Sequence, residues 1–111
     1  MKSKYGNKKT EAGGFMFDSK AEAKRWAELS LMMKAGAISY LMLQPVYKLV
    51  SSVKFEGDKR AKPALRYQAD FAYVENGEPV IEDVKGVETD VFRIKRHLMK
   101  WRYGIDVRII K

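Results

Sequence analysis

The fold is decided by the stretch at residues 65–86, LRYQADFAYVENGEPVIEDVKG, which has the pattern of a β-hairpin. Both arms are rich in β-branched and aromatic residues, and Asn76-Gly77 is a favoured dipeptide for a two-residue turn between antiparallel strands. With these two residues as the turn, Glu75 faces Glu78. Counting outward from that pair places Asp70 directly opposite Asp83, provided that no bulge interrupts either arm.

Two opposed carboxylates in a hairpin need a compensating partner. Directly opposed residues on antiparallel strands have Cβ atoms about 4.5–5.5 Å apart, and like charges there destabilise the sheet. The same register places Gln68 opposite Lys85, and strand alternation puts Asp83 and Lys85 on one face, with Glu82 on the other. We therefore expect one face to carry two carboxylates, an ammonium and an amide. This set suits a divalent cation with oxygen ligands beside a lysine.

Composition limits the class of protein. The chain has 111 residues, of which 46% are hydrophobic and 12% aromatic, so we expect a single domain with a packed core rather than a disordered chain. The absence of cysteine excludes disulfides, thiolate zinc sites and a cysteine nucleophile. No apolar run reaches the roughly 18 residues of a membrane span, and no signal-peptide pattern is present. We expect a cytoplasmic protein, in the host cell if a phage encodes it.

Positive charge is concentrated at the two ends of the chain. The formal net charge is +8, with net +3 in residues 1–14, net +5 in residues 89–111, and none between them. Residues 1–14 are expected to form a flexible basic arm, and residues 15–111 a single domain. A polyanionic partner held by the arm and by a helix explains this distribution. The alternative is that the basic charge only aids solubility.

A first helix is predicted to begin at Asp18-Ser19 and to run to about Ala35, because Gly36 is a natural residue just beyond a helix end. Glu22 begins its inward stripe, which continues with Trp26, Leu29 and Met33. A capping box, in which Glu22 bonds back to Ser19, is the structural alternative to a ligand role. Asp18 as a competing cap would leave Glu22 free to supply a metal oxygen.

A second helix is predicted from Asp90 to about Tyr103, with Thr89 as its N-cap and Gly104 closing it. Its inward stripe is expected to be Val91, Ile94, Leu98 and Trp101. Its outward cations are expected to be Arg93, Arg96 and Lys100, with Lys95 near the edge of the stripe. Strands are predicted at 38–44 and 46–55, separated by Pro45, and at 105–110.

The order of elements and the spacing of charges together resemble a known superfamily. Asp70, a gap of twelve residues and then Asp83-Val84-Lys85 resemble the PD-(D/E)XK nucleases, in which a strand carboxylate faces a (D/E)-x-K on the next strand. Glu22 matches the additional helix carboxylate of many members. Ala69 stands where a proline often precedes the first aspartate. Within the superfamily, the chain looks most similar to the small Holliday junction resolvases of archaea and phages.

The resemblance implies an α/β (α+β) fold with a restriction-endonuclease-like core, in the order α-β-β-β-α-β, with a mixed central sheet flanked by helices. It also implies hydrolysis of DNA phosphodiesters with Mg²⁺, for which Mn²⁺ substitutes. The implied metal ligands are Glu22, Asp70, Asp83 and the Val84 carbonyl. Lys85 would orient the attacking water or stabilise developing charge, and Gln68 would position Lys85. The implied DNA contacts are Lys4, Lys8 and Lys9 in the arm, and Arg93, Lys95, Arg96 and Lys100 on the second helix.

The expected substrate is branched DNA, and the expected assembly is a homodimer. A chain this short has no room for a separate base-reading module, which favours recognition of DNA shape through phosphates. Symmetric cutting of a four-way junction needs two sites and therefore a two-fold dimer. Two alternatives remain: a nuclease for another DNA structure such as a flap, nick or single strand, and a non-catalytic DNA-binding module on the same fold.

Overall fold

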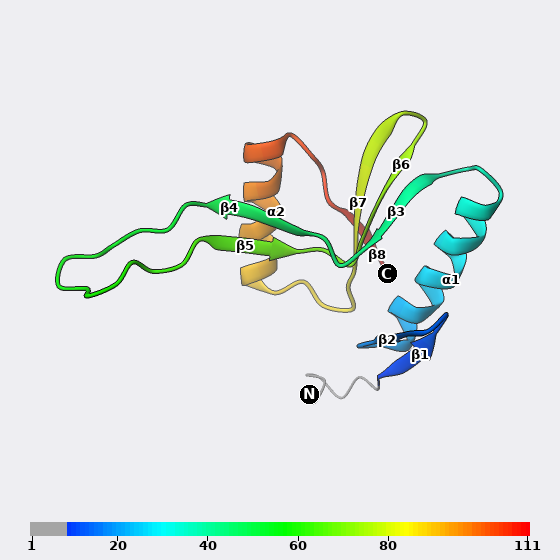
Figure 1. Cartoon of the computed structure of the whole chain (residues 1–111), viewed down its shortest axis with the longest axis horizontal. Coiled ribbons are helices and arrows are strands. Elements are labelled where there is room, and N and C mark those ends of the chain that lie inside the picture. Colours follow the sequence, from blue (N-terminus) through cyan, green and yellow to red (C-terminus); the bar gives the residue numbers. More distant parts are fainter. Residues whose placement is uncertain (1–8) are drawn as a thin grey trace.

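The computed structural model describes residues 9–111 and shows a mixed α+β protein (Figure 1). Two helices and eight strands make up this part of the chain. In chain order they are β1 (Thr10–Ala12), β2 (Phe15–Phe17), α1 (Lys20–Lys34), β3 (Ser39–Leu43), β4 (Val46–Val50), β5 (Leu65–Gln68), β6 (Phe71–Glu75), β7 (Glu78–Val84), α2 (Asp90–Tyr103) and β8 (Arg108–Ile110). None of these helices is long and apolar enough to cross a membrane.

A four-stranded mixed sheet forms the centre of the molecule, in the strand order β3-β6-β7-β8. The first three strands are antiparallel neighbours, whereas β8 joins β7 in parallel. Two separate two-stranded sheets, β1-β2 and β4-β5, lie outside it. Apart from these two hairpins, the chain runs helix, three strands, helix, strand, which is the element order expected from the sequence.

The β6-β7 hairpin has the predicted turn and, near that turn, the predicted register. Glu75 pairs with Glu78, and the ladder continues outward to the pair of Phe71 and Glu82. Asn76 and Gly77 both adopt left-handed backbone conformations, with φ of 53° and 77°. A tight turn between twisted strands requires positive φ at both central residues, which is why this dipeptide forms it.

The register prediction was wrong beyond Phe71. The amide of Asp70 donates to the carbonyl of Glu82 at 3.1 Å, so Asp70 does not pair with Asp83 in the ladder. Gln68 was expected opposite Lys85 but pairs with Val46 of β4. The expected single arm is in fact two strands, because the chain changes sheets between them.

The change of sheet occurs beside Pro45, where the neighbouring strand is also interrupted. The Ala69 amide donates to the Pro45 carbonyl at 3.0 Å, and the Gln44 amide donates to the Asp70 carbonyl at 2.9 Å. Proline cannot donate to a ladder, which separates β3 from β4 as predicted. β3 and β6 therefore stay in the central sheet while β4 and β5 leave it together.

The two helices cover opposite faces of the central sheet (Figure 1). Ala72 and Ile81 face α2 in one core cluster, and Phe71 and Tyr73 face the α1 side in the other. This alternation along β6 is the period of two that a strand buried on both faces requires. The candidate site residues lie where these layers meet.

Helix α1 closely matches its prediction. Ser19 is its N-cap, with its side chain accepting from the Glu22 amide, and Ala35 is its C-cap, followed by Gly36 with φ of 80°. Leu29 is fully buried, but Met33 is 42% exposed and Met32 packs inward instead.

Helix α2 has the predicted bounds and caps, but of its predicted inward stripe only Leu98 packs against the core. Phe92 and Met99 are its buried residues, whereas Val91, Ile94 and Trp101 are 61%, 60% and 76% exposed. The helix carries apolar side chains on two adjacent stripes, so its periodicity alone did not identify the inner one. Aromatic packing decides it, since Phe92 lies against Tyr67 with ring centroids 6.3 Å apart.

The segment expected to be a flexible arm is described only from Lys9 onward. Within it, Thr10–Ala12 forms β1 and pairs with β2, so this part of the expected arm belongs to the folded body. Lys4 and Lys8 lie outside the described residues. Lys9, the first described residue, is exposed.

Candidate active site

Asp83 is the most enclosed of the predicted site residues. It lies in β7 and is 2% exposed, with the Tyr67 hydroxyl donating to its Oδ2. Its Oδ1 lies 3.0 Å from the Lys85 ammonium. A buried carboxylate needs such partners, because removing an ionised group from water costs several kcal/mol. Both oxygens of Asp83 are therefore held in fixed positions.

Lys85 follows two residues later and is 29% exposed at its side chain. Its ammonium lies over the Phe92 ring, 4.6 Å from the ring centroid, and this cation–π contact orients it along with the Asp83 pair. The Lys85 amide donates to the Ile110 carbonyl of β8 at 3.0 Å. The central sheet and α2 together thus fix the position of Lys85, which is still partly exposed to solvent.

Asp70 lies at the point where the chain changes sheets, and its Oδ2 accepts from the Val84 amide at 2.7 Å. The ladder does not place Asp70 opposite Asp83, but this hydrogen bond brings the two aspartates together. Burial, followed by the negative charges of Asp83 and Glu22, raises the pKa of Asp70 to about 8. Three carboxyl groups therefore share one small region.

Glu22 approaches the two aspartates from the first turn of α1. Its Oε2 accepts from the Ser19 hydroxyl at 3.2 Å, and it is partly buried. This contact uses the Ser19 hydroxyl, rather than the Ser19 amide that a capping box predicts. Burial is the main cause that raises the pKa of Glu22, and the negative charges of Asp18 and, to a smaller extent, Asp83 add to the shift. Glu22 thus contacts the N-cap residue Ser19 and also belongs to the cluster of three carboxylates with Asp70 and Asp83.

A cleft of about 450 Å³ opens beside Glu22 and Lys85, between the start of α1 and the loop before α2, and Asp70 and Asp83 are not among the residues that line it. It is lined by Ser19, Ala21, Glu22, Val84, Lys85, Gly86, Val87 and Thr89. Ser19 and Thr89 are the N-caps of the two helices, so the positive ends of both helix dipoles face the cleft. Such ends favour anions, including phosphate groups.

The donor set fits one hydrated divalent cation better than a complete protein cage. Among residues 9–111, no group of three or more His, Cys, Asp or Glu side chains has the arrangement of a metal-binding cluster. Burial is the main cause of the raised pKa of Asp70, and the negative charges of Asp83 and Glu22 add to it; a cation between Asp70 and Glu22 would relieve this charge contribution. Mg²⁺ keeps most of its waters and uses one or two carboxylates, so a sparse set of oxygens suits it.

Gln68 does not belong to this group. It is exposed on β5, where it pairs with Val46, and the sequence-based role of positioning Lys85 is taken by other contacts. Tyr67, its neighbour, points inward and bonds to Asp83. Burial and this bond raise the pKa of Tyr67, which keeps its hydroxyl a donor at neutral pH.

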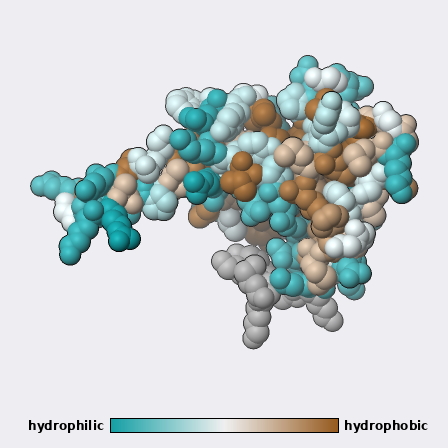
Figure 2. Space-filling view, in the orientation of Figure 1, coloured by the Kyte–Doolittle hydropathy of each residue, from teal (hydrophilic) through white to brown (hydrophobic). Residues whose placement is uncertain are grey.

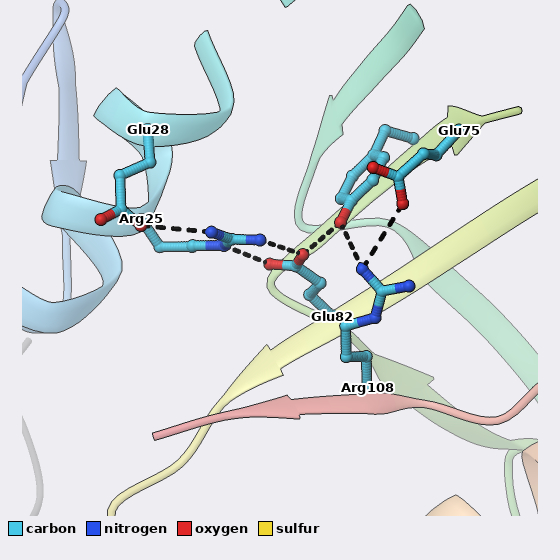
Figure 3. Close-up of polar contacts among 6 residues, drawn as sticks. Arg25, Glu28, Glu75, Glu82 and Arg108 are labelled. Carbon is cyan, nitrogen blue, oxygen red and sulfur yellow. Dashed lines mark hydrogen bonds and ion pairs between the residues drawn. The ribbon is translucent and has the colours of Figure 1, made fainter. Parts of the chain in front are cut away.

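A second buried carboxylate, Glu82, lies on the other face of β7 (Figure 3). The Arg25 guanidinium of α1 binds it through two bonds of 2.7 and 2.6 Å, and the Tyr73 hydroxyl also donates to it. Arg108 of β8 reaches Tyr73 at 3.2 Å and Glu75 at 3.7 Å. Every group in this network has a partner, so we assign it to holding α1 against the sheet.

Three of the cations predicted to bind DNA on α2, Arg93, Arg96 and Lys100, line one shallow hollow with His97 and Asp106, and each has a carboxylate partner. Arg93 lies 2.9 Å from Asp90, Arg96 3.9 Å from Glu88 and Lys100 2.9 Å from Asp106. Lys95 is partly buried and does not line the cleft. None of these four cations lines the cleft that contains Glu22 and Lys85.

Two contributors to the site escaped the sequence analysis. Tyr67 was missed because the assumed register turned its strand the wrong way, and an alternating Tyr in a strand carries no distinctive signal of its own. The Glu82–Arg25 pair was missed because it joins residues far apart in sequence. The run Glu82-Asp83 held one hint, since two adjacent acidic residues in a buried strand place one carboxylate on each face.

The fold and the site define an α+β domain with a buried aspartate–lysine pair beside two further carboxylates at a cleft. The chain belongs to the family described as "Protein of unknown function (DUF1064)", whose pattern matches residues 2–110. No curated protein and no solved structure matches the chain significantly.

Proposed function

We propose that this protein is a metal-dependent DNA endonuclease of the PD-(D/E)XK type, with a restriction-endonuclease-like core. The observation that carries the proposal is the Asp83–Lys85 pair, 3.0 Å apart, with Asp70 bonded to the intervening Val84 amide. Glu22 and the N-termini of two helices complete the cleft around it. The element order helix, three strands, helix, strand also supports this core.

The residues divide the chemistry among them. Asp70 and Glu22 would hold a hydrated Mg²⁺ or Mn²⁺, with Asp83 and the Val84 carbonyl as further candidate oxygens. When bound, such a cation neutralises charge on the phosphate and lowers the pKa of a water. Lys85 stabilises negative charge that develops on the phosphoryl oxygens, and Tyr67 keeps Asp83 in place. The helix N-termini at Ser19 and Thr89 favour a phosphate in the cleft.

The proposed substrate is branched DNA, above all a four-way junction, and the proposed assembly is a homodimer. Two sites related by a two-fold axis are needed to cut a junction symmetrically. Helix α2 offers a surface for a second copy, because Val91, Ile94 and Trp101 form an exposed apolar stripe. Asp90 lies in the first turn and Lys100 in the last turn of this helix, so antiparallel packing of two copies brings opposite charges together.

Two alternatives make different predictions. A nuclease for flaps, nicks or single strands has the same site and differs only in the DNA that it cuts. A non-catalytic DNA-binding module keeps the fold, and the ion pair of Asp83 with Lys85 is then purely structural. Metal-dependent cleavage separates the enzyme from the module, and a panel of DNA structures separates the two enzymes.

The test is cleavage of a labelled four-way junction and of a matched linear duplex, with Mg²⁺ and with EDTA. We expect paired incisions on the junction with Mg²⁺ alone. Asp83→Asn keeps the shape of the side chain and should slow cleavage by at least about a hundredfold, since it removes the charge around which the site is built. Junction binding by Asp83→Asn should be equal to or tighter than wild type.

Glu78→Gln is the matched control, because Glu78 lies in the same strand, is exposed and undergoes the same loss of charge. It should cut at the wild-type rate. Cleavage of flaps or single strands instead of the junction would favour the other nuclease. Tight binding by folded wild-type protein without cleavage of any DNA would favour the binding module.

A further inference from the structure

The β4-β5 hairpin projects from the body as a long two-stranded ribbon (Figure 1). Beyond the paired strands, it is held by two bonds between Val53 and Lys62, of 3.2 and 2.6 Å. Its tip is closed by Asp58, which accepts from the Phe55 amide at 3.1 Å. Hydrogen bonds continue to the tip, so the ribbon is an ordered arm. It has no role in the catalysis proposed above.

The ribbon is strongly basic, although the net charge of the whole middle region of the chain does not reveal it. Residues 46–68 contain six basic and two acidic side chains, a net charge of +4, within a middle region of the chain that sums to zero. The basic residues are Lys48, Lys54, Lys59, Arg60, Lys62 and Arg66. Figure 2 shows hydrophilic side chains gathered at the free end of this arm.

Most of these cations have no carboxylate partner. Lys62 lies 3.8 Å from Asp58, but the remaining ribbon cations form no salt bridge with any residue in the described range 9–111. On α2, by contrast, Arg93, Arg96 and Lys100 are each paired. Free positive charge is therefore concentrated on the ribbon, where five of the six cations lack a carboxylate partner within residues 9–111, whereas on α2 Lys95 and Arg102 lack one.

The two faces of the ribbon base differ sharply. Tyr47 and Tyr67 are paired across the strands on the face toward α2, where the Tyr103 hydroxyl also bonds to the Lys48 carbonyl at 2.6 Å. On the outer face, Lys48 lies directly opposite Arg66, and both are exposed. Like charges directly opposed on a sheet are destabilising, and an anionic partner would relieve the repulsion between these two.

We propose that the ribbon is an arm that binds duplex DNA, with Lys48 and Arg66 on its outer face and Lys59 and Arg60 at its tip contacting phosphates. This inference rests on the proposed DNA substrate. A two-stranded β-ribbon fits the major groove of B-DNA. The ribbon joins the body two residues before Asp70, so DNA lying along it leads to the carboxylate cleft.

A second copy of the chain is a poorer occupant of this surface. Val46, Val50 and Leu65 are exposed beside the cations and would be covered by a protein partner. Packing two outer faces together about a two-fold axis, however, brings two pairs of Lys48 and Arg66 side by side. DNA phosphates neutralise these charges, whereas a second ribbon adds to their repulsion.

The experiment measures binding of full-length protein to a labelled linear duplex in EDTA, over a series of salt concentrations. Lys48→Ala/Arg66→Ala should reduce the salt dependence of log K by about 1.8, because each lost phosphate contact contributes about 0.9. At 0.1 M salt, this corresponds to roughly tenfold to hundredfold weaker binding. Lys48→Arg/Arg66→Lys should bind as tightly as wild type.

The matched control is Lys24→Ala/Lys34→Ala, which removes two exposed cations from α1 and should leave the salt dependence unchanged. Lys59→Ala/Arg60→Ala tests the tip, where both residues are exposed and folding of the core is not at risk. It should also weaken binding and lower the salt dependence.

Three outcomes would overturn the proposal, and they are distinguishable. Wild-type protein that binds no DNA contradicts both the arm and the DNA substrate. Wild-type binding that both ribbon variants retain, with the same salt dependence, contradicts the arm alone. Dissociation of a wild-type dimer by Lys48→Ala/Arg66→Ala, measured by sedimentation equilibrium with DNA binding intact, would identify the ribbon as a contact between copies.

Discussion

At the scale of single residues, Asp70 determines how the candidate site responds to pH. Its pKa is raised to about 8 by burial and by Asp83 and Glu22, so the folded protein holds a proton that the unfolded chain has lost above about pH 4. Stability therefore falls as pH rises, because the folded state binds more protons than the unfolded state. The loss is complete above about pH 8.

The corresponding variant is Asp70→Asn, which stays neutral and still accepts from the Val84 amide. We expect urea unfolding in EDTA to show wild-type stability decreasing between pH 4 and pH 8, by an amount of a few kcal/mol, and the variant to lack this decrease. Added Mg²⁺ should stabilise wild type most at high pH and should have a smaller effect on Asp70→Asn. Identical pH profiles for the two proteins would contradict the proton on Asp70.

At the scale of elements, the Glu82–Arg25 pair joins α1 to β7 and thereby sets where Glu22 lies relative to Asp83. Arg25 follows Glu22 by one turn of α1, and Glu82 precedes Asp83 in β7. Glu82 is fully buried, and its hydrogen bond is the main cause that raises the pKa of Arg25. The same pair, with Tyr73, thus supports both the helix–sheet contact and the geometry of the site.

We predict that Glu82→Ala lowers the free energy of unfolding by about 3–5 kcal/mol, because it leaves Arg25 without its buried partner. Arg25→Met/Glu82→Leu should recover much of this loss, since it removes both charges together. Thermal or urea unfolding of the single and double variants measures the coupling. Glu28→Ala, which removes the exposed partner of Arg25, should stay close to wild type. Additive effects of the two substitutions at 25 and 82 would show that the pair does not hold the helix.

At the scale of the whole molecule, the outward apolar stripe of α2 is the proposed contact between two copies. A groove of about 400 Å³ lined by Arg93, Ile94, His97 and Leu98 lies beside it. Trp101, 76% exposed, is large enough to fill such a groove on a partner. The ribbon is left free to reach DNA in this arrangement.

Ile94→Lys/Trp101→Lys should convert a wild-type dimer into a folded monomer, because it places charges in a contact made of apolar side chains. Sedimentation equilibrium measures the change, and circular dichroism verifies the fold. Lys95→Ala/Arg102→Ala is a control on the same helix that leaves the apolar stripe intact. A wild-type monomer at all concentrations, or a variant that remains dimeric, would rule out this surface.

Much of the fold followed from local sequence signals. Asn76-Gly77 identified its turn because few residues tolerate positive φ, and Ser19, Thr89 and Gly104 identified helix ends because their side chains or backbone satisfy exposed helical groups. Pro45 correctly separated two strands. These signals act between residues a few positions apart and need no knowledge of the remaining chain.

The grouping of Asp70, Asp83 and Lys85 was also predicted from sequence, but for a partly wrong reason. Spacing in the hairpin suggested direct cross-strand pairing, whereas Asp70 reaches the site through the Val84 amide after the chain has changed sheets. Gln68 was placed in the site by the same false register, and Tyr67 was left out of it. A shift of one residue reverses the faces of a strand, which explains both errors.

The sequence by itself determined the helices, the turn and the pair Asp83 and Lys85, because those depend on local backbone preferences and on strand alternation. Only the tertiary structure decided which stripe of α2 is buried, which cations of the ribbon lack a carboxylate partner, and that Glu82 binds Arg25. These features depend on packing between segments distant in sequence. Residues whose local sequence patterns are equivalent differ in burial and in contacts, because the other elements determine the space around each side chain.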